Sequence, residues 1–135
     1  MQIFLRFVAL VVVANAALLV NAYVQEYWAG LLFPRVDPRS YTEMVSAAVV
    51  GALAAATVSA LSLAWLFKRW AWLAGLAISL PVIAIRAPEL AAGPSSSIQQ
   101  ATVAMAWVEM VSYAAAVAGA AWLLSRRRRG AENAL

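Results

Sequence analysis

The sequence predicts an all-α integral membrane protein, a bundle of four transmembrane helices with both termini in the cytoplasm. Of its 135 residues, 65% are hydrophobic and 12% are charged, which is too little polar surface to cover a soluble globule. The apolar residues gather in four runs, and about 20 helical residues span a hydrocarbon core of about 30 Å. None of these runs alternates apolar and polar residues with a period of two, so helices are favoured over barrel strands.

The first predicted helix covers about residues 3–23, and an apolar continuation can extend it to about residue 33. Residues 1–22 also resemble a cleaved signal peptide, because Arg6 precedes an apolar core and Val20-Asn21-Ala22 resembles a small-residue cleavage site. Cleavage would leave three helices and an outside N-terminus. Retention is preferred because the basic start is weak and the apolar run reaches beyond Ala22.

The second and third helices are predicted at about residues 44–67 and 70–86. Pro34 and Pro38 punctuate the connection before the second helix. The pair Lys68-Arg69 leaves room only for a tight turn, so these helices should form an antiparallel hairpin. Pro81 predicts a kink or an early end within the third helix.

The fourth helix is predicted at about residues 98–125, after a loop rich in Pro, Gly and Ser and before a basic C-terminal tail at residues 126–135. No linker divides the chain, so residues 1–135 form one membrane domain.

The distribution of basic residues sets the predicted orientation. Cytoplasmic termini and a cytoplasmic turn between the second and third helices place seven of the ten Lys and Arg residues inside. This agrees with the positive-inside rule and predicts a multi-pass protein of the cell inner membrane. The densest basic cluster is preferred as a topology anchor, with contact to anionic lipid headgroups as the alternative. It consists of Arg126, Arg127, Arg128 and Arg129.

Glu109 is the only carboxylate inside any of the four apolar runs. A charge at membrane depth costs roughly 2.5–3.5 kcal/mol on insertion scales, so it should be paired, protonated or in contact with a polar path. The preferred interpretation is a structural pair with Arg86 or Tyr113 that locks helices together. The alternatives are a carboxylate that couples to a proton or a substrate, and a contact with a partner subunit or an interfacial lipid. The full candidate polar site is Glu109, Arg86, Tyr113, Ser112, Thr102 and Asn15.

The second helix also carries a ridge of small residues with a spacing of four, which allows another helix backbone to approach closely. Packing within one bundle is preferred over packing between copies. The ridge consists of Ala47, Gly51, Ala55 and Ser59.

No enzyme, cofactor or metal site is predicted. The chain has no cysteine, which excludes disulfides and thiolate metal sites, and no histidine, which excludes the usual haem and most transition-metal ligation. The formal charge of +4 comes mostly from one cluster, so it indicates topology, and no nucleic-acid partner is expected. The small multidrug-resistance transporters are similar in size and have four helices and a membrane carboxylate. Their essential glutamate is in the first helix, where this chain has Asn15, so the chain is not assigned to them.

Three functional hypotheses follow from the sequence. The leading one is a non-catalytic accessory or structural subunit of a larger membrane complex, with a protein partner in the membrane and surrounding lipid. The second is a small homo-oligomeric transporter or channel that uses Glu109 for proton or cation coupling. The third is a phage-like membrane-permeabilising protein.

Overall fold

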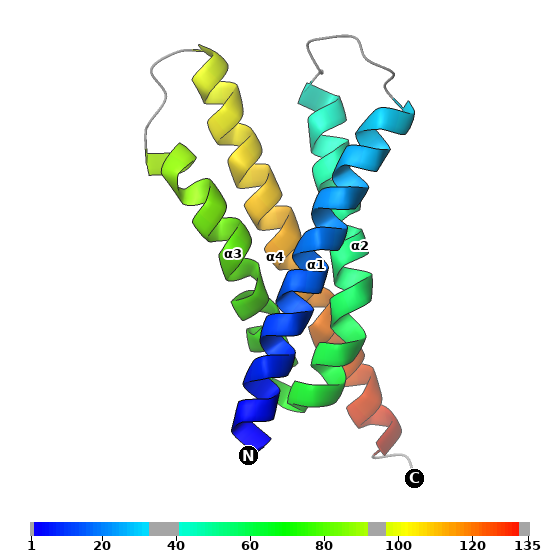
Figure 1. Ribbon diagram of the computed structural model, residues 1–135. Coiled ribbons are helices and arrows are strands. Elements are labelled where there is room, and N and C mark those ends of the chain that lie inside the picture. The colour runs from blue at the N-terminus through cyan, green and yellow to red at the C-terminus, as the bar shows by residue number, and fades with distance from the viewer. Residues whose placement is uncertain (1, 33–40, 92–96, 133–135) are drawn as a thin grey trace.

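The computed structural model describes residues 2–32, 41–91 and 97–132, and this part of the chain is entirely helical (Figure 1). Helix α1 is Gln2–Leu32, α2 is Tyr41–Phe67, the 3-10 turn η1 is Lys68–Trp70, α3 is Ala71–Ala91 and α4 is Ser97–Glu132. The all-α prediction is therefore confirmed for these residues. The predicted connection at Pro34 and Pro38 lies outside them.

Three helical stretches, and not the four spans predicted, are long and apolar enough to cross a membrane: Ile3–Leu31, Tyr41–Pro88 and Gln100–Arg128. The middle stretch has 48 residues because no non-helical residue separates α2, η1 and α3. It is nevertheless folded back on itself. Lys68 has a φ of 47°, in the left-handed region, and α2 and α3 pack against each other. The tight turn predicted at Lys68 is confirmed.

The helix ends differ from the predicted ones. Helix α1 continues to Leu32, which corresponds to the longer of the two predicted lengths. Helix α3 continues through Pro81 to Ala91, so the early end predicted at Pro81 is wrong, whereas the alternative of a kink stays a prediction. Proline removes one backbone hydrogen bond, and the packing of α3 on α4 keeps the helix continuous. Helix α4 runs to Glu132, so the basic tail predicted at residues 126–135 is largely helical, because arginine is a good helix former.

The helices form a bundle with one incompletely closed side. Helix α2 packs extensively on α4, α1 packs on α2, and α3 packs on α4, whereas α1 and α3 make few contacts. The order around the bundle is therefore α1, α2, α4, α3. The turn end of the bundle is the end that carries η1 and both chain termini, and the loop end is the opposite one. Figure 1 shows α1 and α3 diverging toward the loop end.

Small residues bring the helices together in the core. Gly51 lies under α1, where an added Cβ would meet the Asn21 backbone oxygen at 2.9 Å. A Cβ on Gly75 of α3 would meet the α4 backbone at 2.8 Å. The other three residues of the predicted ridge are buried, with exposed fractions of 6% or less: Ala47, Ala55 and Ser59. The ridge therefore packs inside this bundle.

Candidate functional site

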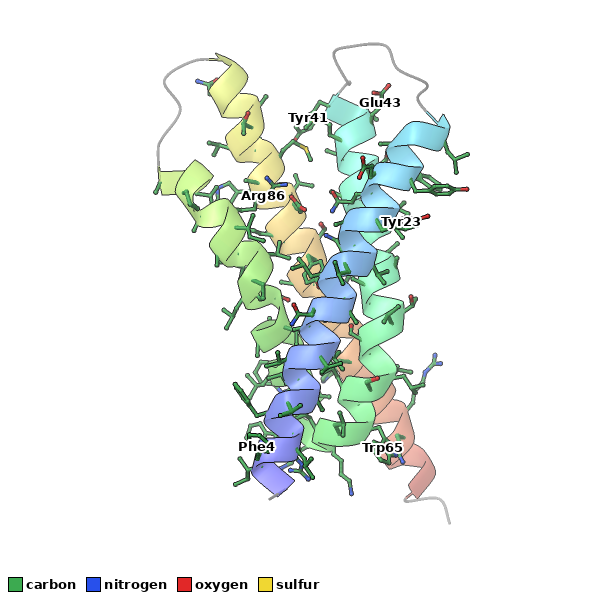
Figure 2. The ribbon with its side chains drawn as sticks, viewed as in Figure 1. Phe4, Tyr23, Tyr41, Glu43, Trp65 and Arg86 are labelled. Atoms are coloured by element: carbon green, nitrogen blue, oxygen red, sulfur yellow. The ribbon has the colours of Figure 1, made fainter. Side chains whose placement is uncertain are left out.

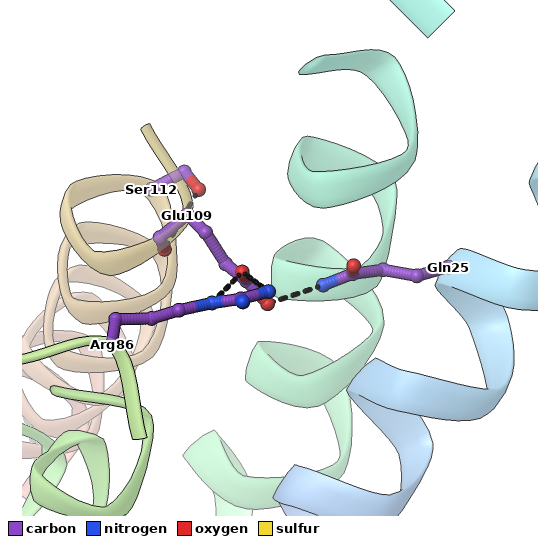
Figure 3. Close-up of polar contacts among 4 residues, drawn as sticks. All are labelled: Gln25, Arg86, Glu109 and Ser112. Atoms are coloured by element: carbon purple, nitrogen blue, oxygen red, sulfur yellow. Dashed lines mark hydrogen bonds and ion pairs between the residues drawn. The ribbon is translucent and has the colours of Figure 1, made fainter. Parts of the chain in front are cut away.

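Glu109 on α4 is held by side chains from two other helices (Figure 3). Arg86 of α3 donates from Nε to Glu109 Oε2 at 2.7 Å, and its Nη2 forms an ion pair with the same oxygen. Gln25 of α1 donates from Nε2 to Glu109 Oε1 at 3.1 Å. Both carboxylate oxygens therefore accept charge-assisted hydrogen bonds, which are roughly twice as strong as neutral ones.

The carboxylate connects helices that otherwise barely meet. Among the described residues, the α1 and α4 backbones are not in contact, and those of α1 and α3 make few contacts. Glu109 therefore links the two helices that border the incompletely closed side, which we call the rim helices. It reaches α1 through Gln25 and α3 through Arg86. The Glu109 side chain is 12% exposed and that of Arg86 is 34% exposed. The charge is thus largely desolvated, and its partners offset the cost of burying it.

Gln25 belongs to the site, although it is not among the residues predicted from the sequence. The sequence predicts a first helix at about residues 3–23, and Gln25 lies in the apolar continuation that can extend this helix to about residue 33. In the structure α1 continues to Leu32. The available signal was the spacing of four between Asn21 and Gln25, which places two amides on one face of the helix.

Two predicted site residues on α4 do not touch the carboxylate. Ser112 donates from Oγ to the Glu109 backbone oxygen at 3.2 Å, which is a bond within the helix. Tyr113 is 1% exposed, and its hydroxyl has no hydrogen-bond partner in the described part of the chain. The proposed pairing of Glu109 with Tyr113 is therefore wrong, because the ring points into the hydrophobic core. Thr102 is exposed near the loop end and lines the cleft described below.

Asn15 does not join the site either. Its side chain is exposed, and Nδ2 donates to the Val11 backbone oxygen of α1 at 2.8 Å. The side-chain amide therefore finds its hydrogen-bond partner on its own helix. Its inclusion in the predicted polar site with Glu109 is thus wrong.

Two cavities follow the incompletely closed side. The larger has a volume of about 1040 Å³ and includes Gln25, Arg86 and Glu109 in its lining. The smaller, of about 360 Å³, lies between α1 and α3 nearer the turn end and includes Asn15 and Pro81. Among the described residues, the two cavities share no lining residue, and the larger is also lined by residues of α2 and α4. We call the pair of cavities the seam groove and describe it by its lining residues on α1 and α3. The α1 members include Val11, Asn15, Leu18, Ala22 and Glu26, and the α3 members include Ala77, Pro81, Ala84 and Ile85.

The seam groove is mostly apolar, with a polar band at the level of Glu109. Figure 2 shows Arg86 between α3 and α4, with Tyr41 nearer the loop end. Glu26 of α1 is exposed and lines the same cavity. The groove is thus lined mostly by apolar side chains of the helices, with a few polar groups among them, which is the usual composition of a binding site.

The basic cluster is on α4. Arg126, Arg127 and Arg128 are exposed, whereas the Arg129 side chain lies outside the described part of the structure. The Arg126 guanidinium lies over the Trp122 ring, 5.4 Å from its centroid.

The described residues contain no group of three or more His, Cys, Asp or Glu side chains that could hold a metal ion. The arrangement around Glu109 can join helices and present a polar band to a bound molecule. Comparison with protein-family models, with curated proteins and with solved structures finds no match to this chain.

Proposed function

We propose that the chain is a non-catalytic, four-span membrane protein that serves as an accessory or structural subunit of a larger membrane complex. The proposal of four spans rests on the middle apolar stretch. As one straight helix, its 48 residues would be about 72 Å long, more than twice a core of about 30 Å. The reversal at η1 divides it into α2 and α3, each of a length suited to one crossing.

The proposed orientation places the turn end in the cytoplasm and the protein in the cell inner membrane. Both chain termini and η1 lie at this end (Figure 1). It carries Arg6, Lys68, Arg69 and the cluster at residues 126–129. An excess of Lys and Arg in the short cytoplasmic segments sets the orientation of membrane proteins.

The observation that carries the subunit proposal is the seam groove. Its α1 lining extends from Leu10 to Glu26, which is about 24 Å of helix at about 1.5 Å per residue and most of a membrane crossing. Alanines on both walls, Ala22 on α1 and Ala84 on α3 among them, allow close approach of another helix backbone. A single transmembrane helix of a partner would therefore close the fourth side of the bundle.

The Glu109 network suits this role. A carboxylate beside an open groove must be shielded from lipid, and Arg86 and Gln25 already satisfy both of its oxygens. The proposed partner helix would then meet the Arg86–Glu109 ion pair, which has no net charge, at one position along the groove.

The second candidate is a small transporter or channel in which Glu109 binds a proton or a cation, and the observation in its favour is that Glu109 lines an open cavity. A proton or cation would have to displace Arg86 from the carboxylate. Under this alternative, Glu109→Gln abolishes flux in proteoliposomes. Under the subunit proposal, the unaltered protein and this variant give the same background flux.

Site-specific photo-crosslinking tests the subunit proposal. A photoreactive residue replaces Ile85, which lines the groove, or Leu61 of α2 as a control; these are 59% and 71% exposed. We expect Ile85 to crosslink one membrane protein, identified by mass spectrometry, and Leu61 to crosslink lipid. Adding Ala84→Trp places a bulky ring in the smaller cavity, which obstructs a helix along the groove and should abolish the protein crosslink. Equal crosslinking at both positions, or survival of the crosslink in the Ala84→Trp variant, would contradict the proposal.

A further inference from the structure

A second surface lies at the turn end, far from the groove's polar band. The turn η1 packs against α4, and both η1 and the end of α4 carry basic residues. Figure 1 shows the α2 to α3 reversal and the last turns of α4 at the same end. We define the turn-end patch as the exposed residues Lys68, Arg69 and Trp70 of η1 with Trp122, Arg126 and Arg127 of α4.

Each half of the patch holds a guanidinium against an indole ring. Arg69 lies over Trp70 at 5.2 Å from the ring centroid, and Arg126 lies over Trp122 at 5.4 Å. Such cation–π contacts orient the cation on the ring face. The rings are 52% exposed for Trp70 and 41% exposed for Trp122. Tryptophan in membrane proteins is enriched at headgroup level, so the proposed membrane placement puts these cations at the depth of lipid phosphates.

The turn backbone fixes the conformation of the η1 half of the patch. Lys68 occupies the left-handed region at φ 47°, which a lysine adopts only when the surroundings determine it. The Ala71 backbone N–H donates to the Lys68 oxygen and closes the turn. The Lys68 and Arg69 side chains are therefore exposed on a rigid reversal that packs on α4.

We propose that the turn-end patch binds the headgroup of an anionic phospholipid, with η1 and α4 contributing to one shared site. Arginine recognises phosphate through paired N–H donors, and lysine adds a mobile charge. A zwitterionic headgroup carries an ammonium that four nearby cations repel, so the site selects net negative charge. The inference rests on the proposed membrane placement but not on the partner helix in the groove.

The expected effect is large enough to measure. Each basic residue near an anionic headgroup strengthens binding about five-fold, so removing two should weaken it about thirty-fold. The η1 variant is Lys68→Gln with Arg69→Gln, and the α4 variant is Arg126→Gln with Arg127→Gln. If the two segments form one site, both variants lose affinity for the same bound lipid.

The experiment is a titration of the detergent-solubilised chain, followed by native mass spectrometry. The probes are phosphatidylglycerol and phosphatidylethanolamine with identical acyl chains, and the measurement is the dissociation constant of the first bound lipid. We expect at least a ten-fold preference for phosphatidylglycerol, lost in both variants and retained when Arg126 and Arg127 become Lys. Arg6→Gln removes a charge at the same end outside the patch and should change the constant less than two-fold.

Several results would overturn the inference. Equal affinity for the two lipids would remove the charge selectivity, and loss in the α4 variant alone would remove the shared site. A loss in Arg6→Gln as large as in the double variants would indicate diffuse attraction. Helix content by circular dichroism confirms that each variant is folded. Release of the chain from membranes by alkaline carbonate would instead contradict the proposed membrane placement, and the crosslink at Ile85 tests the subunit proposal separately.

Discussion

Replacing Arg86 is the most direct test of the Glu109 network. Glu109 is 12% exposed, and Arg86→Gln removes its ion pair and leaves the hydrogen bond from Gln25. Removing one partner of a fully buried ion pair costs about 3–5 kcal/mol, and hydrogen bonds to charged groups contribute about 1.5–3 kcal/mol. Because Arg86 is 34% exposed, water screens part of the interaction. We expect Arg86→Gln to lower the free energy of unfolding by about 2–3 kcal/mol.

A double-mutant cycle separates the pair from the individual side chains. Glu109→Gln leaves Arg86 near solvent and should cost about 1–2 kcal/mol, and the double variant should cost about 2 kcal/mol because no unpaired charge remains buried. The coupling between Arg86 and Glu109 is then about 2 kcal/mol. The measurement is reversible unfolding in mixed micelles, followed by helix content. A coupling below about 0.5 kcal/mol, the level of an exposed ion pair, would refute the structural role assigned to the network.

Three further predictions concern the core. Gly75→Ala should destabilise the bundle by about 1–3 kcal/mol, because the new Cβ meets the α4 backbone at 2.8 Å. Among the described residues, nothing lies within 4 Å of the new Cβ in Gly119→Ala, which should be neutral or stabilising. Thermal unfolding of the two variants tests this difference. Tyr113→Phe should stabilise the fold by about 1 kcal/mol, because its buried hydroxyl lacks a partner among the described residues; an equal loss of stability would show that the hydroxyl is bonded. Leu63→Ala, at 0% exposed, should cost about 2–5 kcal/mol in the same unfolding assay, and Leu61→Ala, at 71% exposed, should be close to neutral.

Much of the fold could be predicted because it depends on local signals. Apolar runs give the helices, and Lys68-Arg69 gives the reversal, since two polar residues between apolar runs permit only a short turn. Helix ends were less predictable. Pro81 lies inside a helix that continues to Ala91, because tertiary packing on α4 outweighs one missing hydrogen bond.

The site was predictable in its charged members and unpredictable in its neutral ones. A carboxylate in an apolar run needs a partner, and Arg86 was the candidate at the matching level, which is where the ion pair forms. A side-chain amide can hydrogen-bond to its own helix or to another helix of the bundle, and the sequence does not distinguish these two possibilities. Asn15 bonds to the Val11 oxygen, whereas Gln25 reaches Glu109 on another helix. The difference lies in the surroundings, because Gln25 is within reach of Glu109 whereas Asn15 is exposed on α1.

The packing order explains why this carboxylate can be structural and still lie beside a groove. In a closed four-helix bundle each helix meets two neighbours, but here α1 and α3 make few contacts. Side chains must then bridge that side, and a carboxylate on α4 with two acceptor oxygens can hold one donor from each rim helix. The same bridge holds α1 and α3 apart, so the groove is present in the chain without the proposed partner. A preformed groove reduces the ordering cost of association, which is the physical advantage of placing the network there.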